Sequence, residues 1–384
     1  MENQIEKEIP AFKNVPINKF AIGELEKKYV NEALDTGWIS SEGPFVKKFE
    51  NALAKLVGRT YGVAVTNGTV ALDLAVKALG IGPGDEVIMP SFSIISCAQA
   101  VVKLGAIPRF TDVDDKTWNM DVSQIEKLIT KKTVAIMVVH TYGLTVPMDE
   151  VLAIAKKYNL KIIEDAAEAH GQSYKGRPCG SFGDVSIFSF YPNKNITTGE
   201  GGMVLCDDQK IFDRLASLRN LGFIPERRFV HFEEGTNARL SNILAGIGLA
   251  QLMRLDETVA RKKMMGNNYQ MLLAGLPDVT LPLTETSFCK NNYWVFGIVF
   301  GPSWPDLPEI EERLLKDGVG NRPFFFGLHE QPLYQNEAFF KTQRLPVTER
   351  ISRRGLYIPS GVATTLEDQE YVARILEKIA RECV

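Results

Sequence analysis

The chain of 384 residues has few cysteines, and none of them forms a pair in the sequence. The five stand singly, with no C-x-x-C motif and no metal-ligand spacing to the four histidines: Cys97, Cys179, Cys206, Cys289 and Cys383. We interpret them as reduced thiols of a cytoplasmic protein, and we expect neither a disulfide framework nor a metal site.

The sequence also lacks an excess of positive charge and a long apolar run. Lys and Arg number 44 against 47 Asp and Glu, which gives a net charge of −3 and no broad basic face for nucleic acid. No stretch reaches the roughly 18 apolar residues of a membrane span, and the first residues contain acids and no apolar signal segment. We therefore expect a cytoplasmic protein with neither nucleic acid nor membrane as a partner, which binds anionic ligands through a few local groups.

The composition is that of a globular protein, with 45% hydrophobic and 24% charged residues, so it excludes a disordered, collagen-like or coiled-coil chain. Between about residues 23 and 222, short apolar runs alternate with helical periods such as 70–78 and 149–158, which is typical of βαβ units. The predicted strands are 61–66, 86–89, 108–111, 133–139, 161–164, 185–190 and 203–206. This pattern predicts a doubly wound α/β fold with a mostly parallel sheet and ligands at the carboxyl ends of its strands.

A long helical stretch over 243–273 is followed by prolines and a strand-like run at 293–300, with helices predicted at 309–316 and 366–381. The length of the chain favours two domains. We place their boundary near Gly275, which gives a larger domain of residues 1–275 and a smaller α+β domain of residues 276–384.

Three local patterns carry chemistry. A strand that runs into a polar, glycine-rich turn presents Lys194 at a strand end, although a hairpin with a solvated lysine is the commoner structure for such a pattern. A buried-looking strand ends at Asp165, and a buried acid needs a positive partner unless Asp165 only caps the next turn. Gly68 and Thr69 lie between a strand and a helix, where free N–H groups can bind phosphate, although this is also ordinary turn chemistry.

Together the three patterns require a ligand with an aldehyde for Lys194, a protonated ring nitrogen for Asp165 and a phosphate. Pyridoxal phosphate has all three groups. The sequence resembles the DegT/DnrJ/EryC1/StrS family of nucleotide-sugar aminotransferases in segments spread over nearly the whole chain: 37–44, 66–69, 90–93, 165–171, 188–203, 237–242 and 321–329. The resemblance implies the type I, aspartate aminotransferase fold, with a large seven-stranded, mostly parallel sheet domain and a smaller C-terminal domain.

The resemblance also implies roles for residues of the cofactor site. Lys194 would form the Schiff base with pyridoxal phosphate and then move the proton, while Asp165 would keep the ring nitrogen protonated. Glu168 would lie beside the ring oxygen, and we expect it to be protonated or compensated there. The phosphate would be bound by Gly68, Thr69 and Ser189. Asn237 would reach the phosphate of a neighbouring subunit, which implies a homodimer with shared active sites, or a higher oligomer.

Two positions depart from the family pattern. Ile94 stands where an aromatic ring usually faces the cofactor, and Ala238 stands where an aromatic often follows Asn237. Neither change removes a reacting group. The candidates for substrate contact are Trp38, Arg227, Arg228, Arg322 and His329. The arginine pair at 227–228 and His329 also have ordinary interpretations, as a solvated surface and as a packing residue.

The implied reaction transfers the amino group of L-glutamate, through pyridoxamine phosphate, to a nucleotide-linked keto sugar. Segments 197–203 and 322–325 most resemble the members that aminate C4 of a 4-keto-6-deoxyhexose, so we expect GDP-4-keto-6-deoxymannose as acceptor and a product for O-antigen lipopolysaccharide. The alternatives are UDP- or dTDP-4-keto-6-deoxyglucose, or a 3-keto sugar. Sugar dehydratases of the family have another residue in place of the Schiff-base lysine, so the presence of Lys194 argues against dehydration. A non-catalytic regulator would not need the intact set of site residues.

Overall fold

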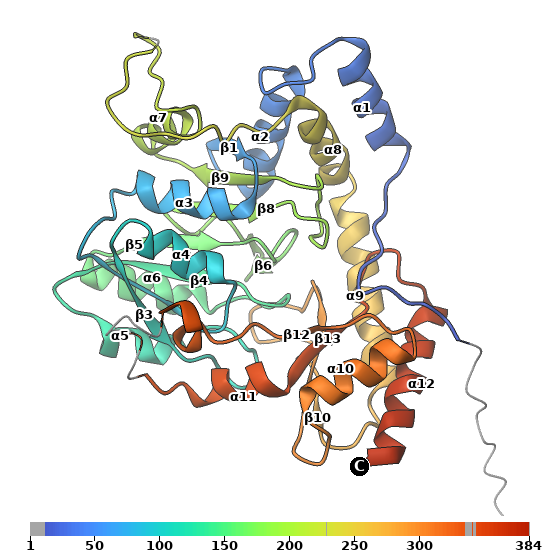
Figure 1. The fold of residues 1–384 in the computed structure, drawn as a ribbon. Coiled ribbons are helices and arrows are strands. Elements are labelled where there is room, and N and C mark those ends of the chain that lie inside the picture. Colours follow the sequence, from blue (N-terminus) through green and yellow to red (C-terminus); the bar gives the residue numbers. More distant parts are fainter. Residues whose placement is uncertain (1–11, 228, 335–339, 341–342, 384) are drawn as a thin grey trace, which may run out of the picture.

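A seven-stranded sheet forms the centre of the larger part of the protein, in a computed structural model that describes residues 12–227, 229–334, 340 and 343–383 (Figure 1). Its strands run in the order β1-β9-β8-β5-β4-β2-β3. They are β1 (Tyr61–Val65), β2 (Glu86–Pro90), β3 (Ile107–Thr111), β4 (Thr133–Val139), β5 (Lys161–Asp165), β8 (Val185–Ser189) and β9 (Gly202–Cys206). Only β9 pairs antiparallel with its neighbours, β1 and β8. The doubly wound, mostly parallel fold is confirmed, and each of the seven strands predicted between residues 61 and 206 agrees with an observed one to within a residue at either end.

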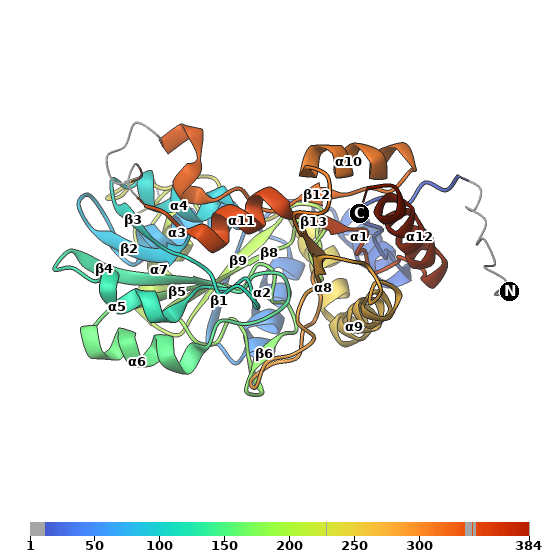
Figure 2. The same cartoon turned by 90° about the horizontal axis from the view of Figure 1, so that it is seen from below.

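Helices cover both faces of this sheet because successive strand residues point to opposite sides. Val63 and Val65 of β1 pack in one core with α3 (Gly68–Ala78), α4 (Ile95–Val102) and α7 (Gln209–Leu218). Ala64, between them, packs on the other side with α2 (Pro44–Val57) and α8 (Asn242–Leu252). That side also carries α5 (Ile125–Leu128) and α6 (Met148–Tyr158), and Figure 2 shows α6 and α3 on opposite sides of the sheet.

A second, antiparallel sheet has the order β10-β11-β13-β12. Its strands are β10 (Val279–Thr280), β11 (Phe296–Phe300), β13 (Gly355–Ile358) and β12 (Arg322–Pro323). One face packs against α9 (Leu255–Leu272), α10 (Leu307–Lys316) and α12 (Leu366–Cys383). On the other face, Val299 and Tyr357 pack with Phe92, Trp118 and Tyr142 from the larger part. This aromatic layer joins the two sheets beside the carboxyl ends of the parallel strands.

The remaining elements are short or peripheral. They are α1 (Glu24–Asp35), α11 (Pro346–Arg354), the hairpin strands β6 (Ser173–Tyr174) and β7 (Arg177–Pro178), and the 3-10 turns η1 (Val122–Gln124), η2 (Leu328–Glu330) and η3 (Pro332–Tyr334). Within the described residues, no helix is both long enough and apolar enough to cross a membrane.

The helix predicted over 243–273 is two helices, α8 and α9, so this prediction was wrong about continuity. The break falls at Arg254, whose φ of −112° and ψ of 14° leave the helical region. Its guanidinium binds the carbonyl of Ala21 and the carboxylate of Glu26. These contacts hold the chain at the break, where α8 ends and α9 turns toward the smaller sheet.

An N-terminal segment of residues 12–21, here called the strap, packs on the smaller sheet (Figure 1). Val15 pairs with Val319, and Lys13 and Lys19 bind Asp368 of α12 at 2.9 and 2.6 Å. Conversely, residues beyond position 275 belong to the core of the larger sheet: Leu328, Tyr334, Phe340 and Leu345. The division into residues 1–275 and 276–384 stays a prediction, because both ranges contribute to both cores.

Candidate functional site

A cavity of about 710 Å³ opens at the carboxyl ends of β5 and β8, as predicted for a doubly wound sheet. It brings together residues from distant segments of the chain. The lining includes the sequence-predicted Gly68, Thr69, Ile94, Asp165, Glu168, Ser189, Lys194 and Arg322, together with Ser93, Ser96, Asn193, Trp294, Phe325 and Tyr357, which the sequence did not single out.

Lys194 lies in the loop between β8 and β9, with its amine held near an acid and an aromatic ring. Its Nζ is 3.5 Å from Oε1 of Glu168 and 3.9 Å from the ring centroid of Trp294. Trp294 is fixed in turn, because its Nε1 donates to the carbonyl of Asn193 at 2.9 Å. Burial lowers the pKa of Lys194, although the nearby carboxylates act in the opposite direction. The lowered pKa favours the neutral, nucleophilic amine.

Asp165 is the last residue of β5 and is only 2% exposed. Its Oδ1 accepts from the backbone N–H of Ala167 at 3.0 Å, and its Oδ2 accepts from Sγ of Cys97 at 3.3 Å. Burial raises the pKa of Asp165. A carboxylate in this environment is stabilised by a positive partner, which a protonated ring nitrogen supplies.

Glu168 lies between Lys194 and the backbone of Tyr142, whose N–H donates to Oε2 of Glu168 at 3.1 Å. Burial raises the pKa of Glu168 from 4.5 to about 7, and the neighbouring Asp165 contributes in the same direction. Burial and Asp165 therefore favour a proton on Glu168, and its place beside the ring oxygen stays a prediction.

The start of α3 forms the phosphate-binding candidate. A Cβ on Gly68 would lie 2.7 Å from Cβ of Ser189, so only glycine lets α3 and the end of β8 approach this closely. The hydroxyl of Thr69 lies 2.8 Å from Oγ of Ser96, and the side chain of Asn67 caps α3 through the N–H of Val70. Free N–H groups at a helix N-terminus favour an anion. The lysine, the buried acid and this cradle therefore fit the aldehyde, ring nitrogen and phosphate of pyridoxal phosphate.

Not every predicted residue lines this cavity. His329 is buried, with Nδ1 2.7 Å from Oγ of Ser91, and it does not belong to the lining. Trp38, Arg227 and Asn237 are exposed and also lie outside the cavity of their own chain. Arg228 lies outside the described residues.

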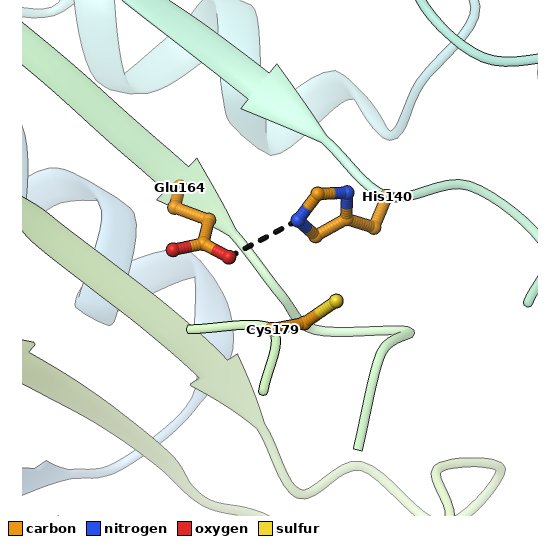
Figure 3. A group of neighbouring side chains, drawn as sticks. All are labelled: His140, Glu164 and Cys179. Atoms are coloured by element: carbon orange, nitrogen blue, oxygen red, sulfur yellow. Dashed lines mark hydrogen bonds and ion pairs between the residues drawn. The ribbon is translucent and has the colours of Figure 1, made fainter. Parts of the chain in front are cut away.

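A second polar group was not predicted from the sequence. Figure 3 shows His140, Glu164 and Cys179, all buried, with one potential ligand atom of each within 4.8 Å of the others. Nδ1 of His140 accepts from the N–H of Val146 at 3.2 Å, so Nε2 carries the proton and donates to Glu164 at 3.1 Å. The same carboxylate accepts N–H groups from the turn at 180–183. We interpret the group as a satisfied hydrogen-bond network that holds this turn against β5.

Comparison with known proteins gives one consistent result. The profile of the DegT/DnrJ/EryC1/StrS aminotransferase family matches residues 21–377. A GDP-perosamine synthase of Escherichia coli O157:H7 is 40% identical over 95% of this chain and 98% of its own, and one of Caulobacter vibrioides is 41% identical over 92% and 95%. The structure of S. venezuelae DesV, in complex with a ketimine intermediate, superposes with a TM-score of 0.87 at 33% identity, covering 96% and 98% of the two chains. The chain therefore belongs to the DegT/DnrJ/EryC1/StrS family of pyridoxal phosphate-dependent aminotransferases.

Proposed function

We propose that the protein transfers an amino group from L-glutamate to C4 of GDP-4-keto-6-deoxymannose and forms GDP-perosamine. The observation that carries the proposal is the meeting of Lys194, Asp165 and the Gly68–Ser189 contact in one cavity. The two GDP-perosamine synthases, similar over more than nine-tenths of this chain, support this acceptor over its alternatives.

Each residue of the cavity has a distinct proposed role. When bound, pyridoxal phosphate supplies an electron sink for the amino-acid carbon. Lys194, as a neutral amine, would hold the cofactor through its aldehyde and would then move a proton at its Nζ, while Asp165 would keep the ring nitrogen protonated. Glu168 holds a proton beside the ring oxygen. The phosphate is bound by Gly68, Thr69 and Ser189.

Arg322 is the proposed contact to the nucleotide-sugar substrate. It is exposed at β12 and lines both this cavity and an adjoining one of about 140 Å³, to which Asn18, Phe20 and Tyr357 also contribute. Because the net charge of the chain is −3, a diphosphate must be bound by a few placed cations, and a guanidinium suits phosphate oxygens.

We propose a homodimer in which each site is completed by the partner. Asn237, Trp38 and Arg227 do not line their own cavity. They lie within three residues in sequence of the lining of a separate groove of about 870 Å³, which includes Ser41, Glu42, Glu226 and Arg239. Phe229 and Phe232, in the loop that follows, are 74% and 73% exposed. Exposed aromatic side chains beside a groove are typical of a protein interface, which supports a second copy of this chain as the occupant.

We also propose a cytoplasmic location and a role in O-antigen lipopolysaccharide synthesis. The support for the location is indirect: all five cysteines are free. The role in O-antigen synthesis requires perosamine to be the product, so a different product would overturn it.

The acceptor is tested by kinetics with GDP-4-keto-6-deoxymannose, UDP-4-keto-6-deoxyglucose and dTDP-4-keto-6-deoxyglucose at equal glutamate concentration, with product mass as the readout. We expect the GDP sugar to give the highest kcat/KM, and the turnover of the Lys194→Ala variant to fall by at least about a hundredfold with every acceptor. A higher kcat/KM with the UDP or the dTDP sugar would overturn the GDP acceptor. A preference for a 3-keto sugar nucleotide or for a keto acid, assayed alongside, would overturn amination at C4 of a nucleotide sugar.

A further inference from the structure

The first turn of α4 contacts both ends of the cofactor site through two adjacent residues. Ser96 touches Thr69 of the phosphate cradle, and Cys97 touches Asp165. We propose that this turn is a positioning element, in which Ser96 and Cys97 fix the phosphate cradle and the ring acid relative to each other. The inference rests on the proposed roles of Thr69 and Asp165, and it adds two residues to the site that the sequence patterns did not indicate.

The contact of Cys97 is buried and directional. The side chain has no exposed surface, and its Sγ lies 3.3 Å from Oδ2 of Asp165 and 3.3 Å from Oγ of Ser93. Burial and the neighbouring acid raise the pKa of the Cys97 thiol well above its ordinary value, so the sulfur keeps its proton and donates it. Since the N–H of Ala167 binds Oδ1, both oxygens of Asp165 are held by the protein.

The contact of Ser96 fixes the other end. Its Oγ is 2.8 Å from Oγ1 of Thr69, the second residue of α3, and α4 packs against α3 along the same face of the sheet. Ser93 and Ser96 both line the cavity. Because Ser96 and Cys97 are consecutive in one helix, neither Thr69 nor Asp165 can shift without straining the contact of the other.

A thiol is a weaker hydrogen-bond donor than a hydroxyl, so it stabilises the ionised carboxylate less. Serine at position 97 would therefore lower the pKa of Asp165, and alanine would raise it. The other titratable groups that act on Asp165 or lie next to it are Lys194, His140 and Glu168, and none of these is changed by such a substitution.

The test compares the cofactor-free wild type with the variants Cys97→Ala, Cys97→Ser and Ser96→Ala. Cys206→Ala is the control for loss of a buried thiol that does not line the cavity. Affinity is measured for pyridoxal phosphate and for pyridoxal, which lacks the phosphate. Cys97→Ala should weaken both ligands by about three- to tenfold, the effect of losing one hydrogen bond. Ser96→Ala should weaken pyridoxal phosphate to a similar degree and leave pyridoxal unchanged, and Cys206→Ala should change neither.

The pH dependence gives a readout that a merely structural role would not move. Affinity for pyridoxal phosphate should fall at low pH, when Asp165 takes up a proton. This fall is the acid limb of the curve of affinity against pH, and it should move to higher pH in Cys97→Ala and to lower pH in Cys97→Ser. Equal affinities and equal acid limbs in the wild type and both Cys97 variants would overturn the role of Cys97. If Cys97→Ala does not fold, the direction of the shift in Cys97→Ser decides alone. If the wild type bound no pyridoxal phosphate, the site assignment itself would fail, which is a distinguishable result.

Discussion

Replacing Glu168 by glutamine should stabilise the cofactor-free protein above neutral pH. Burial raises the pKa of Glu168 from 4.5 to about 7, a rise of about 2.5 pKa units. At about 1.36 kcal/mol per pKa unit, this rise corresponds to about 3 kcal/mol of unfolding free energy. The figure is an upper bound, because the variant also removes the carboxylate that lies 3.5 Å from Nζ of Lys194.

The sign follows from proton binding. Between pH 4.5 and 7 the folded wild type retains a proton on Glu168 that the unfolded chain has released, so its stability falls as the pH rises, and the whole loss is present above pH 7. Glutamine does not titrate. The variant should therefore match the wild type near pH 4.5 and exceed it by up to about 3 kcal/mol at pH 8.

Urea unfolding followed by circular dichroism, at pH 5 and pH 8, measures this difference. Glu200→Gln is the matched control, because it removes a carboxylate from an exposed side chain in the loop that carries Lys194. If Glu168→Gln and the wild type lost stability in parallel over this pH range, the reasoning that Glu168 holds a proton in the folded site would be refuted.

Three further predictions concern the site and the assembly. Lys194→Ala should still fold and bind pyridoxamine phosphate, because Asp165 and the phosphate cradle remain, but its turnover should fall by at least about a hundredfold; substantial steady-state transamination would contradict this. Mixing Lys194→Ala with Asn237→Ala chains, allowed to exchange subunits, should restore about a quarter of the wild-type activity, since each hybrid dimer has one intact site; no gain over the parent variants would disprove a shared site. Trp294→Phe removes the hydrogen bond from Nε1 to the carbonyl of Asn193 and should lower the unfolding free energy by about 1 kcal/mol, measured by urea unfolding; an unchanged midpoint would show that this bond contributes nothing.

The strands and the principal groups of the cavity could be predicted because their signals are local. An apolar run bounded by polar turns defines β5 or β8, and Asp165 and Lys194 follow directly from where these runs end. In a doubly wound sheet, neighbouring carboxyl ends meet, so the topology alone brings the two residues together.

Other features depend on contacts between distant segments and left no local signal. Trp294 lies 100 residues beyond Lys194, and only the packing of the smaller sheet places its ring over the amine. In the sequence Cys97 is an isolated thiol, and only the fold brings its Sγ to Oδ2 of Asp165. His329 is buried in the turn η2, where its Nδ1 lies beside Oγ of Ser91, so it does not face the cavity.

The strap constrains the order in which the protein can assemble during synthesis. Asn18 donates to the carbonyl of Pro192, two residues before Lys194, yet the strap is fixed by Val319 and Asp368, which are made some 300 or more residues later. At about 5–20 residues per second, roughly 20 to 70 seconds separate the synthesis of Asn18 from that of Asp368. On the ribosome the parallel sheet can form well before the strap makes its contacts with Val319 and Asp368. The loop between β8 and β9, which carries Lys194, should therefore reach its final arrangement only after α12 has been synthesised. An incomplete chain would have a folded sheet but an incomplete site.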